Sequence, residues 1–444
     1  MANPAAGLAA DILSVSLEKV STRLPELLET TDTVASLIKK SAEAVKISDK
    51  CYRIPLLKSK GGVAGAFDPD TGTLHSGTGP KTINLSAGYK YTDIAFELSM
   101  REIDTTASSE QSVLNAFKYS LNNAMSEYNV YDDIWFHQDG TGVLTGRASA
   151  NSTWTSGDTL TFAAATDYVG VKRIRPGMGV QVFTYDYTSA RTVATDPIIV
   201  DHVDYDNKLV AFIGAITAES SGATGDVLAV PGCTATLTTG ASTWPLSGDS
   251  FRHGLYYAHD ITGTNYYLGK LKSDNTELMP SVVNASSSAI SFAHVQAMLD
   301  KLVMRRSESA YKGLIGLADM KQRAKVQDIG VSISEWFRQP GAQKMPDLQP
   351  DNVGYTSTFQ MCGLTIYTDK RQDQSRIDFI NPKNWGRAVV RDPGFLEVGG
   401  RRIFEGRTTG GLQTVSQFFH IVSGFDWFSF DPGAEAYIYS LSVA

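Results

Sequence analysis

The chain has 444 residues, a formal net charge of -7 at pH 7 and a hydrophobic fraction of 42%. This length suffices for two or three domains, and the apolar content supports ordinary globular cores. The acidic balance excludes a dedicated nucleic-acid binder, because neutralising phosphates requires Lys and Arg clustered in a basic domain. It is compatible with a protein that only encloses DNA.

Three cysteines, Cys51, Cys233 and Cys362, lie far apart without a CxxC spacing. This spacing indicates separate thiols in a reducing compartment, and neither a disulfide framework nor a zinc site. The first basic residue is Lys19, so no cationic segment precedes an apolar core as in a signal peptide. No apolar run is long enough to cross a bilayer. We therefore expect a cytoplasmic chain that does not bind a membrane.

Residues 1–50 predict an N-terminal arm. From about Asp11 to Lys46 apolar residues recur at helical spacing, with a break at Pro25. A helical segment with a single apolar stripe is too short to fold alone. We expect this stripe to dock on another surface.

Residues 51–100 predict an extended hairpin. Alternating stretches at 52–56 and 89–96 bracket a centre rich in glycine and other turn formers. The centre, residues 61–79, has few apolar side chains, chiefly Val63, Phe67 and Leu74. An isolated two-stranded ribbon is marginal in water. This one is therefore either mobile or completed by a neighbouring molecule.

Residues 101–142 contain the most helical stretch of the chain, at 108–137. Apolar residues recur there at intervals of three and four, and Gly140 and Gly142 end the pattern. At the rise of an α-helix this stretch gives a rod of about 42 Å, which is long for a compact domain.

Residues 143–240 turn to Thr, Ser, Gly, Val and Asp, and they predict an inserted small all-β domain. The residues at 205–208 read as a hairpin turn. We expect the segment to fold by itself, with 140–142 and 240–250 as linkers. The predicted strands lie at 159–162, 180–183, 197–200, 209–213 and 226–230.

The remaining residues, 241–362 and 363–444, predict mixed α/β structure. A helix is expected at 291–306 with Ser291 as its N-cap, and another near 318–326. The last stretch is rich in strands and aromatic residues. The fold class of the whole chain is therefore α+β.

No segment carries a strong catalytic or cofactor motif. The run from Gly263 to Lys270 resembles a phosphate-binding loop, but it has one residue too many between its glycines and Leu271 in place of the magnesium-binding hydroxyl. The seven histidines form no metal-binding spacing, and no nucleophile elbow occurs. We expect a protein that is not an enzyme and that needs no cofactor or metal.

Basic residues gather late in the chain, where they suit three roles: a solvated sheet face, charge pairing between subunits, or a lining that meets DNA. The sequence does not distinguish these roles. The cluster includes Arg387, Arg391, Arg401 and Arg402.

The order of arm, glycine-rich hairpin, long helix, mixed domain and strand-rich tail resembles the major capsid proteins of tailed bacteriophages, with the Hong Kong 97-type fold. Local sequence similarities also support the resemblance, but the order of the elements is more specific than any single local similarity. They occur at 139–144 after the long helix, at 279–285 before the next helix, and in the tail at 376–382, 425–427 and 431–438.

The resemblance implies an N-terminal arm (1–50), an E-loop hairpin (51–100), a peripheral domain with a spine helix (101–142), an axial domain (241–362) and a returning segment (363–444). The all-β insertion at 143–240 departs from the minimal pattern. The implied function is a virion capsid subunit that forms hexamers and pentamers around double-stranded DNA and assembles in the host bacterial cytoplasm. Implied partners are other copies of the chain, portal, scaffolding and decoration proteins.

Inter-subunit contacts are expected from two groups of residues. In the hairpin they are Lys58, Lys60, Val63, Phe67 and Leu74, and in the tail Arg387, Arg391, Arg401 and Arg402. Some members of the family cross-link through a loop lysine, but the sequence shows no acceptor for Lys58 or Lys60. One alternative is the shell of an encapsulin-type nanocompartment, and another, from a different class, is a β-rich hydrolase or adhesin.

Overall fold

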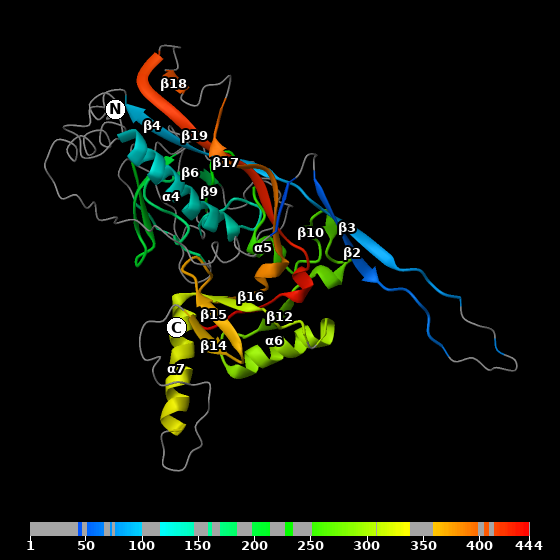
Figure 1. Ribbon diagram of the computed structural model, residues 1–444. Coiled ribbons are helices and arrows are strands. Elements are labelled where there is room, and N and C mark those ends of the chain that lie inside the picture. Colours follow the sequence, from blue (N-terminus) through cyan, green and yellow to red (C-terminus); the bar gives the residue numbers. More distant parts are fainter. Residues whose placement is uncertain are drawn as a thin grey trace.

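The computed structural model describes residues 43–46, 51–65, 72, 76–99, 116–145, 159–161, 169–183, 198–213, 227–233, 251–307, 309–337, 358–397, 404–407 and 413–443. Figure 1 shows an upper body built on long strands, a lower body with a second sheet and two helices, and a hairpin that projects from the region between them. None of the helices in these residues is long and apolar enough to cross a membrane.

The upper body is organised around the strand β19 (Gln413–Ser429). It pairs antiparallel with β17 (Trp385–Phe395), β18 (Phe404–Arg407) and β4 (Lys90–Ser99). The helix α4 (Ala116–Phe136) lies along this sheet (Figure 1), with contacts to β4 and β19. Aromatic side chains from helix and sheet meet in the core, where the Phe136 ring packs edge-on to Trp385 and Trp427.

The arm and the long helix differ in part from the sequence predictions. The short strand β1 (Glu43–Lys46) pairs parallel with β17, where a helix was expected to reach Lys46. Pairing with an available strand edge has outweighed local helical spacing there. The predicted helix at 108–137 corresponds to α4, and residues 101–115 and 1–42 lie outside the described residues.

The projecting hairpin consists of β2 (Tyr52–Ser59) and β3 (Lys81–Ala87), paired antiparallel with Ile54 opposite Leu85. The return strand predicted at 89–96 is therefore wrong as the partner of β2. That stretch lies in β4 and pairs with β19. Both 81–87 and 90–99 alternate, and Gly88 separates them, so periodicity alone did not reveal which of the two turns back on β2.

Within its described residues the insertion forms a five-stranded antiparallel sheet, as its turn spacing predicted. The turn between β7 (Ile198–Asp204) and β8 (Leu209–Ile213) is held by the Asp204 carboxylate, which accepts hydrogen bonds from the backbone N–H groups of Asp206 and Asn207. In spatial order the strands are β5 (Thr159–Thr161), β8 (Leu209–Ile213), β7 (Ile198–Asp204), β6 (Gly179–Phe183) and β9 (Val227–Ala229).

The glycine turn that leads into this sheet is buried, contrary to its interpretation as a linker. The backbone N–H of Phe251 donates to Gly140 O at 2.8 Å, and that of Val230 donates to Gly142 O at 2.9 Å. Buried residues of the sheet, such as Val180 and Val210, belong to the same hydrophobic cluster as those of α4. The sheet thus shares its core with the upper body, and its independent folding stays a prediction.

The lower body is a six-stranded mixed sheet flanked by α6 (Phe292–Arg305) and α7 (Met320–Phe337). Ser291 is the N-cap residue of α6, as predicted. Its hydroxyl lies 3.0 Å from His294 Nδ1, with no bond to a backbone N–H. In spatial order the strands are β12 (Ser281–Asn284), β20 (Ala436–Tyr439), β16 (Ile377–Ile380), β13 (Ile315–Ala318), β15 (Leu364–Thr368) and β14 (Thr358–Met361).

Strand β16 is buried on both of its faces. Ile377 and Phe379 belong to the core beneath α6, whereas Ile380 belongs to the core of the upper body. Because side chains alternate along a strand, Asp378 faces the same way as Ile380. The sheet therefore brings a carboxylate to the boundary between the two bodies.

The run at 263–270 forms a hairpin. The strand β10 (Tyr266–Tyr267) pairs with β11 (Lys270–Leu271), and Leu268 and Gly269 make the turn with φ of 45° and 81°. A phosphate-binding loop joins a strand to a helix, with its backbone N–H groups turned to the ligand. Residues 263–270 instead form a strand hairpin, so they do not have the geometry of a phosphate-binding loop.

Gly254 offers a direct test of how the upper body is packed. A Cβ atom at this position would overlap the carbonyl of Phe136 and lie 2.9 Å from Gln138 O. We expect Gly254→Ala to lower the free energy of unfolding of the unassembled subunit by about 3 kcal/mol, because backbone atoms cannot give way as flexible side chains do. Urea unfolding of the wild type and the variant measures this difference in the free energy of unfolding.

Gly263→Ala is the matched control, because its Cβ would lie 3.6 Å from the Ser273 Cβ, an ordinary contact. Its effect should stay within about 0.5 kcal/mol. Equal stability of the two variants would contradict the packing described here.

Candidate assembly surface and the buried junction behind it

The hairpin is buried only at its root. Ile54, Leu85 and Ala87 are at most 4% exposed, whereas Leu57 and Val63 are 57% and 50% exposed further out. Among the described residues, β2 and β3 pair only with each other. The outer part of the ribbon therefore has two open edges and little packing of its own (Figure 1).

Lys58 fastens the hairpin to its own subunit. Its ammonium donates to Asp274 O at 2.8 Å and to Asn275 Oδ1 at 3.0 Å, and it pairs with Glu277 Oε1 at 3.0 Å. Partial burial opposes ionisation of Glu277, but hydrogen bonds from its own backbone and from Lys58 hold the pKa of Glu277 below its usual value. The ribbon thus leaves the body in a defined direction.

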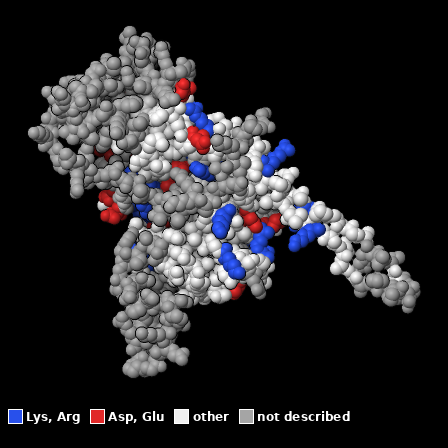
Figure 2. Space-filling model, in the orientation of Figure 1, with Lys and Arg blue, Asp and Glu red and all other residues white. Residues whose placement is uncertain are grey.

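The other predicted hairpin contacts are on the surface or outside the described residues. Lys60 and Val63 are exposed on the ribbon. Phe67 and Leu74 lie outside the described residues. On the face drawn in Figure 2, basic side chains gather near the hairpin root, while the described ribbon beyond it is mostly uncharged. Contact between subunits through these residues stays a prediction.

The two described arginines of the tail cluster, Arg387 and Arg391, lie within β17. The Arg387 guanidinium stacks 5.6 Å from the Phe425 ring and 5.3 Å from the Trp427 ring. Arg391 donates to Phe395 O at 2.9 Å. Both therefore make contacts within the subunit, and Arg401 and Arg402 lie outside the described residues.

A buried polar junction, which the sequence analysis missed, lies at the boundary between the two bodies. His259, which follows the short helix α5 (Leu255–Ala258), lies between two carboxylates. Its Nδ1 is 2.6 Å from Asp378 Oδ1 and its Nε2 is 2.8 Å from Glu435 Oε2, and all three side chains are 0% exposed. Arg376 completes the group through hydrogen bonds to Asp378 at 2.6–3.0 Å.

The charges at this junction depend on one another. Burial alone would lower the pKa of His259, but hydrogen bonds and the negative charges of Asp378 and Glu435 raise it above the usual value. Burial raises the pKa of Glu435. Burial opposes ionisation of Asp378 too, but Arg376 and His259 hold the pKa of Asp378 well below its usual range. A carboxylate at each nitrogen favours the protonated form of the ring.

Further pairs of ionisable side chains, buried except at Glu127, connect α4 and the residue after it to other elements. Arg371 Nε donates to Asp133 Oδ2 at 2.7 Å, and His137 Nε2 lies 2.6 Å from Asp369 Oδ2. Arg175, from the turn before β6, pairs with Glu127 at 3.2 Å. Removing one partner of such a pair leaves an uncompensated buried charge, which is strongly destabilising. These pairs fix how α4, the inserted sheet and the lower body sit together.

These parts make up the Hong Kong 97-type fold: a strand of the arm on the long-stranded sheet, a projecting hairpin, a long helix and a second sheet with helices. The fold predicted from the sequence resemblance is confirmed. No protein-family model and no curated protein matches the sequence.

Solved structures match over nearly the whole chain. The capsid asymmetric unit of cyanophage A-1(L) has a TM-score of 0.55 at 10% identity, covering 96% of this chain and 97% of that chain. The capsid of a native GTA particle has a TM-score of 0.47 at 8% identity, covering 95% of each. A holo encapsulin complex from Synechococcus elongatus PCC 7942 has a TM-score of 0.45 at 7% identity, covering 98% and 96%. At such identities the likeness is one of fold.

The state of His259 predicts a pH dependence of stability. Because the pKa of His259 is raised on folding, its contribution is complete below the usual value of about 6.5 and is lost as the pH rises through the folded value. We expect His259→Gln to lower the melting temperature most near pH 6, by an amount that shrinks as the pH increases. Thermal unfolding of the unassembled subunit across this range measures it.

His202→Gln is the control, because the His202 side chain is 63% exposed. It should change the melting temperature little at any pH. A gap between wild type and His259→Gln that widens with rising pH would contradict the imidazolium assignment.

Proposed function

We propose that this chain is a major capsid protein, which assembles as hexamers and pentamers into a closed icosahedral shell around double-stranded DNA. The likeness of almost the entire chain to the capsid asymmetric unit of cyanophage A-1(L) is the observation that carries the proposal. The proposal includes assembly in the cytoplasm of a host bacterium and incorporation into the virion capsid.

The hairpin gives this proposal a physical basis. A ribbon with two open edges and a mostly exposed surface contributes little to the stability of its own subunit. It gains buried area and hydrogen-bond partners when it lies across a neighbouring copy. A contact that repeats head to tail closes into a ring when the rotation between copies permits it, which is how hexamers and pentamers form.

The same proposal names the partners. They are other copies of the chain, portal and scaffolding proteins, and a decoration protein. DNA is enclosed without sequence-specific binding, in keeping with the net charge of -7. An encapsulin-type shell would enclose protein cargo instead, and electron microscopy with nucleic-acid analysis of purified particles separates the two outcomes.

Assembly should depend on the outer hairpin. We expect replacement of residues 61–79 by a short turn to leave the melting temperature of the isolated subunit nearly unchanged and to abolish shell formation. The reason is that the described side chains in this segment are largely exposed. Negative-stain microscopy and sedimentation, with any scaffolding partner co-expressed, measure the outcome.

Gly77→Ala is the matched control, because nothing lies within 4 Å of its added Cβ. It should assemble as wild type does. A wild-type chain that stays monomeric under assembly conditions would defeat the proposal, and a large loss of stability in the truncated chain would show that the hairpin packs internally.

We further propose that the protein performs no catalysis. The hairpin geometry of residues 263–270 supports this for nucleotide chemistry. Equilibrium dialysis should therefore detect no stoichiometric ATP binding, and Lys270→Ala should change nothing. ATP binding at one molecule per subunit, abolished by Lys270→Ala, would overturn this part of the proposal.

A further inference from the structure

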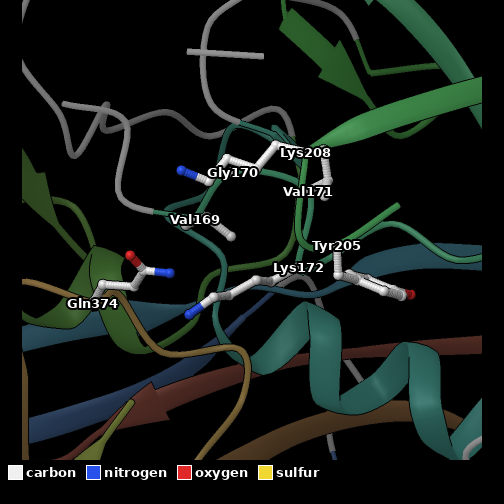
Figure 3. A pocket seen from close by; sticks show the side chains of 7 residues that line it. All are labelled: Val169, Gly170, Val171, Lys172, Tyr205, Lys208 and Gln374. Atoms are coloured by element: carbon white, nitrogen blue, oxygen red, sulfur yellow. The ribbon is translucent and has the colours of Figure 1, made fainter. Parts of the chain in front are cut away.

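A small open cavity lies where the inserted sheet meets the loop that follows β15. Its volume is about 20 Å³. One wall is the turn at 169–172 before β6, another is the turn between β7 and β8, and the third is Gln374 (Figure 3). Two of its lining residues are lysines, Lys172 and Lys208.

The polar groups of three segments converge on this cavity. Figure 3 shows the side chains of Lys172 and Lys208 extending toward the same side, with the amide nitrogen of Gln374 turned toward the space between them. Lys208 passes over Gly170, where a Cβ atom would lie 3.7 Å from Lys208 Cδ. This is an ordinary van der Waals distance, so the Lys208 side chain runs close to the Gly170 backbone.

Positive charge is in excess around Lys208. Burial, and then the nearby charges of Lys321 and Lys172, lower the pKa of Lys208. The Asp319 carboxylate pairs with Lys172. An anion bound between Lys208 and Lys172 would reduce the repulsion that the neighbouring ammonium groups exert on Lys208.

Lys208 also occupies a backbone position that favours glycine. Its φ is 59°, in the left-handed region, at the end of the turn that Asp204 holds. Residues with a Cβ atom rarely adopt this conformation, because the Cβ crowds the following carbonyl. Glycine would relieve this strain but would lose the ammonium.

We propose that this cavity is a phosphate-type oxyanion site. One oxygen of the anion occupies the cavity, whose volume suits a single water-sized atom. The ammonium groups of Lys208 and Lys172 and the Gln374 amide bind it, and the remaining oxygens stay in solvent. The bound anion links the inserted sheet to the loop at 369–374. Its source is free phosphate or the phosphodiester of a nucleic acid, which present the same chemistry.

Titration of the full-length, unassembled subunit with inorganic phosphate, followed by phosphorus NMR, tests the site. We expect saturable binding by wild type and by Lys208→Arg. Lys208→Gly should raise the dissociation constant about tenfold or more, because it removes a charge-assisted hydrogen bond. Its melting temperature without phosphate should be unchanged or higher, since glycine relieves the backbone strain.

Lys312→Gln, at an exposed position before β13, removes one positive charge elsewhere and should bind as wild type does. The proposal is overturned if wild type shows no saturable binding, if Lys208→Gly binds as tightly, or if Lys312→Gln weakens binding equally. A short DNA duplex added as competitor identifies the source. Displacement of phosphate assigns the site to phosphodiesters, and lack of displacement assigns it to free phosphate.

Discussion

The upper body depends on the alternation of buried side chains along β19. Phe419, Ile421, Phe425 and Trp427 are at most 2% exposed, and they form one continuous core with α4 and β17. Strands β4, β17 and β18 all pair with β19, and only two residues separate the end of the hairpin strand β3 from the start of β4. The pairing of β4 with β19 therefore helps to set the direction in which the hairpin leaves the body.

Sequence reasoning worked where structure is specified locally. The turn at 205–208 and the strands beside it were predicted from their own residues, and in the structure Asp204 and Asn207 hold this turn within a few residues. Sequence reasoning failed where pairing between strands far apart in the chain determines the structure. The stretch at 89–96 alternates as a hairpin strand would, but its partner, β19, comes more than 300 residues later. Local spacing at 43–46 was likewise overruled by pairing with β17.

The buried junction lay beyond the reach of sequence motifs. His259 meets Asp378 and Glu435 across 119 and 176 residues, so no spacing rule for catalytic or metal-binding histidines applies to it. The one local signal is β16, whose four consecutive residues include an Asp among apolar side chains. A carboxylate in a fully buried strand requires a cationic partner, and the search for that partner would have led to Arg376 and His259.

The two open edges of the hairpin have a consequence for the free chain. Unpaired strand edges invite pairing with any other exposed strand, which leads to aggregation. Pro55 lacks a backbone N–H donor within β2, Pro80 precedes β3, and two exposed lysines, Lys60 and Lys81, lie on the otherwise mostly uncharged ribbon. Two such ribbons brought edge to edge repel each other. The ribbon thus disfavours indiscriminate stacking of newly made chains while remaining able to lie on a complementary surface.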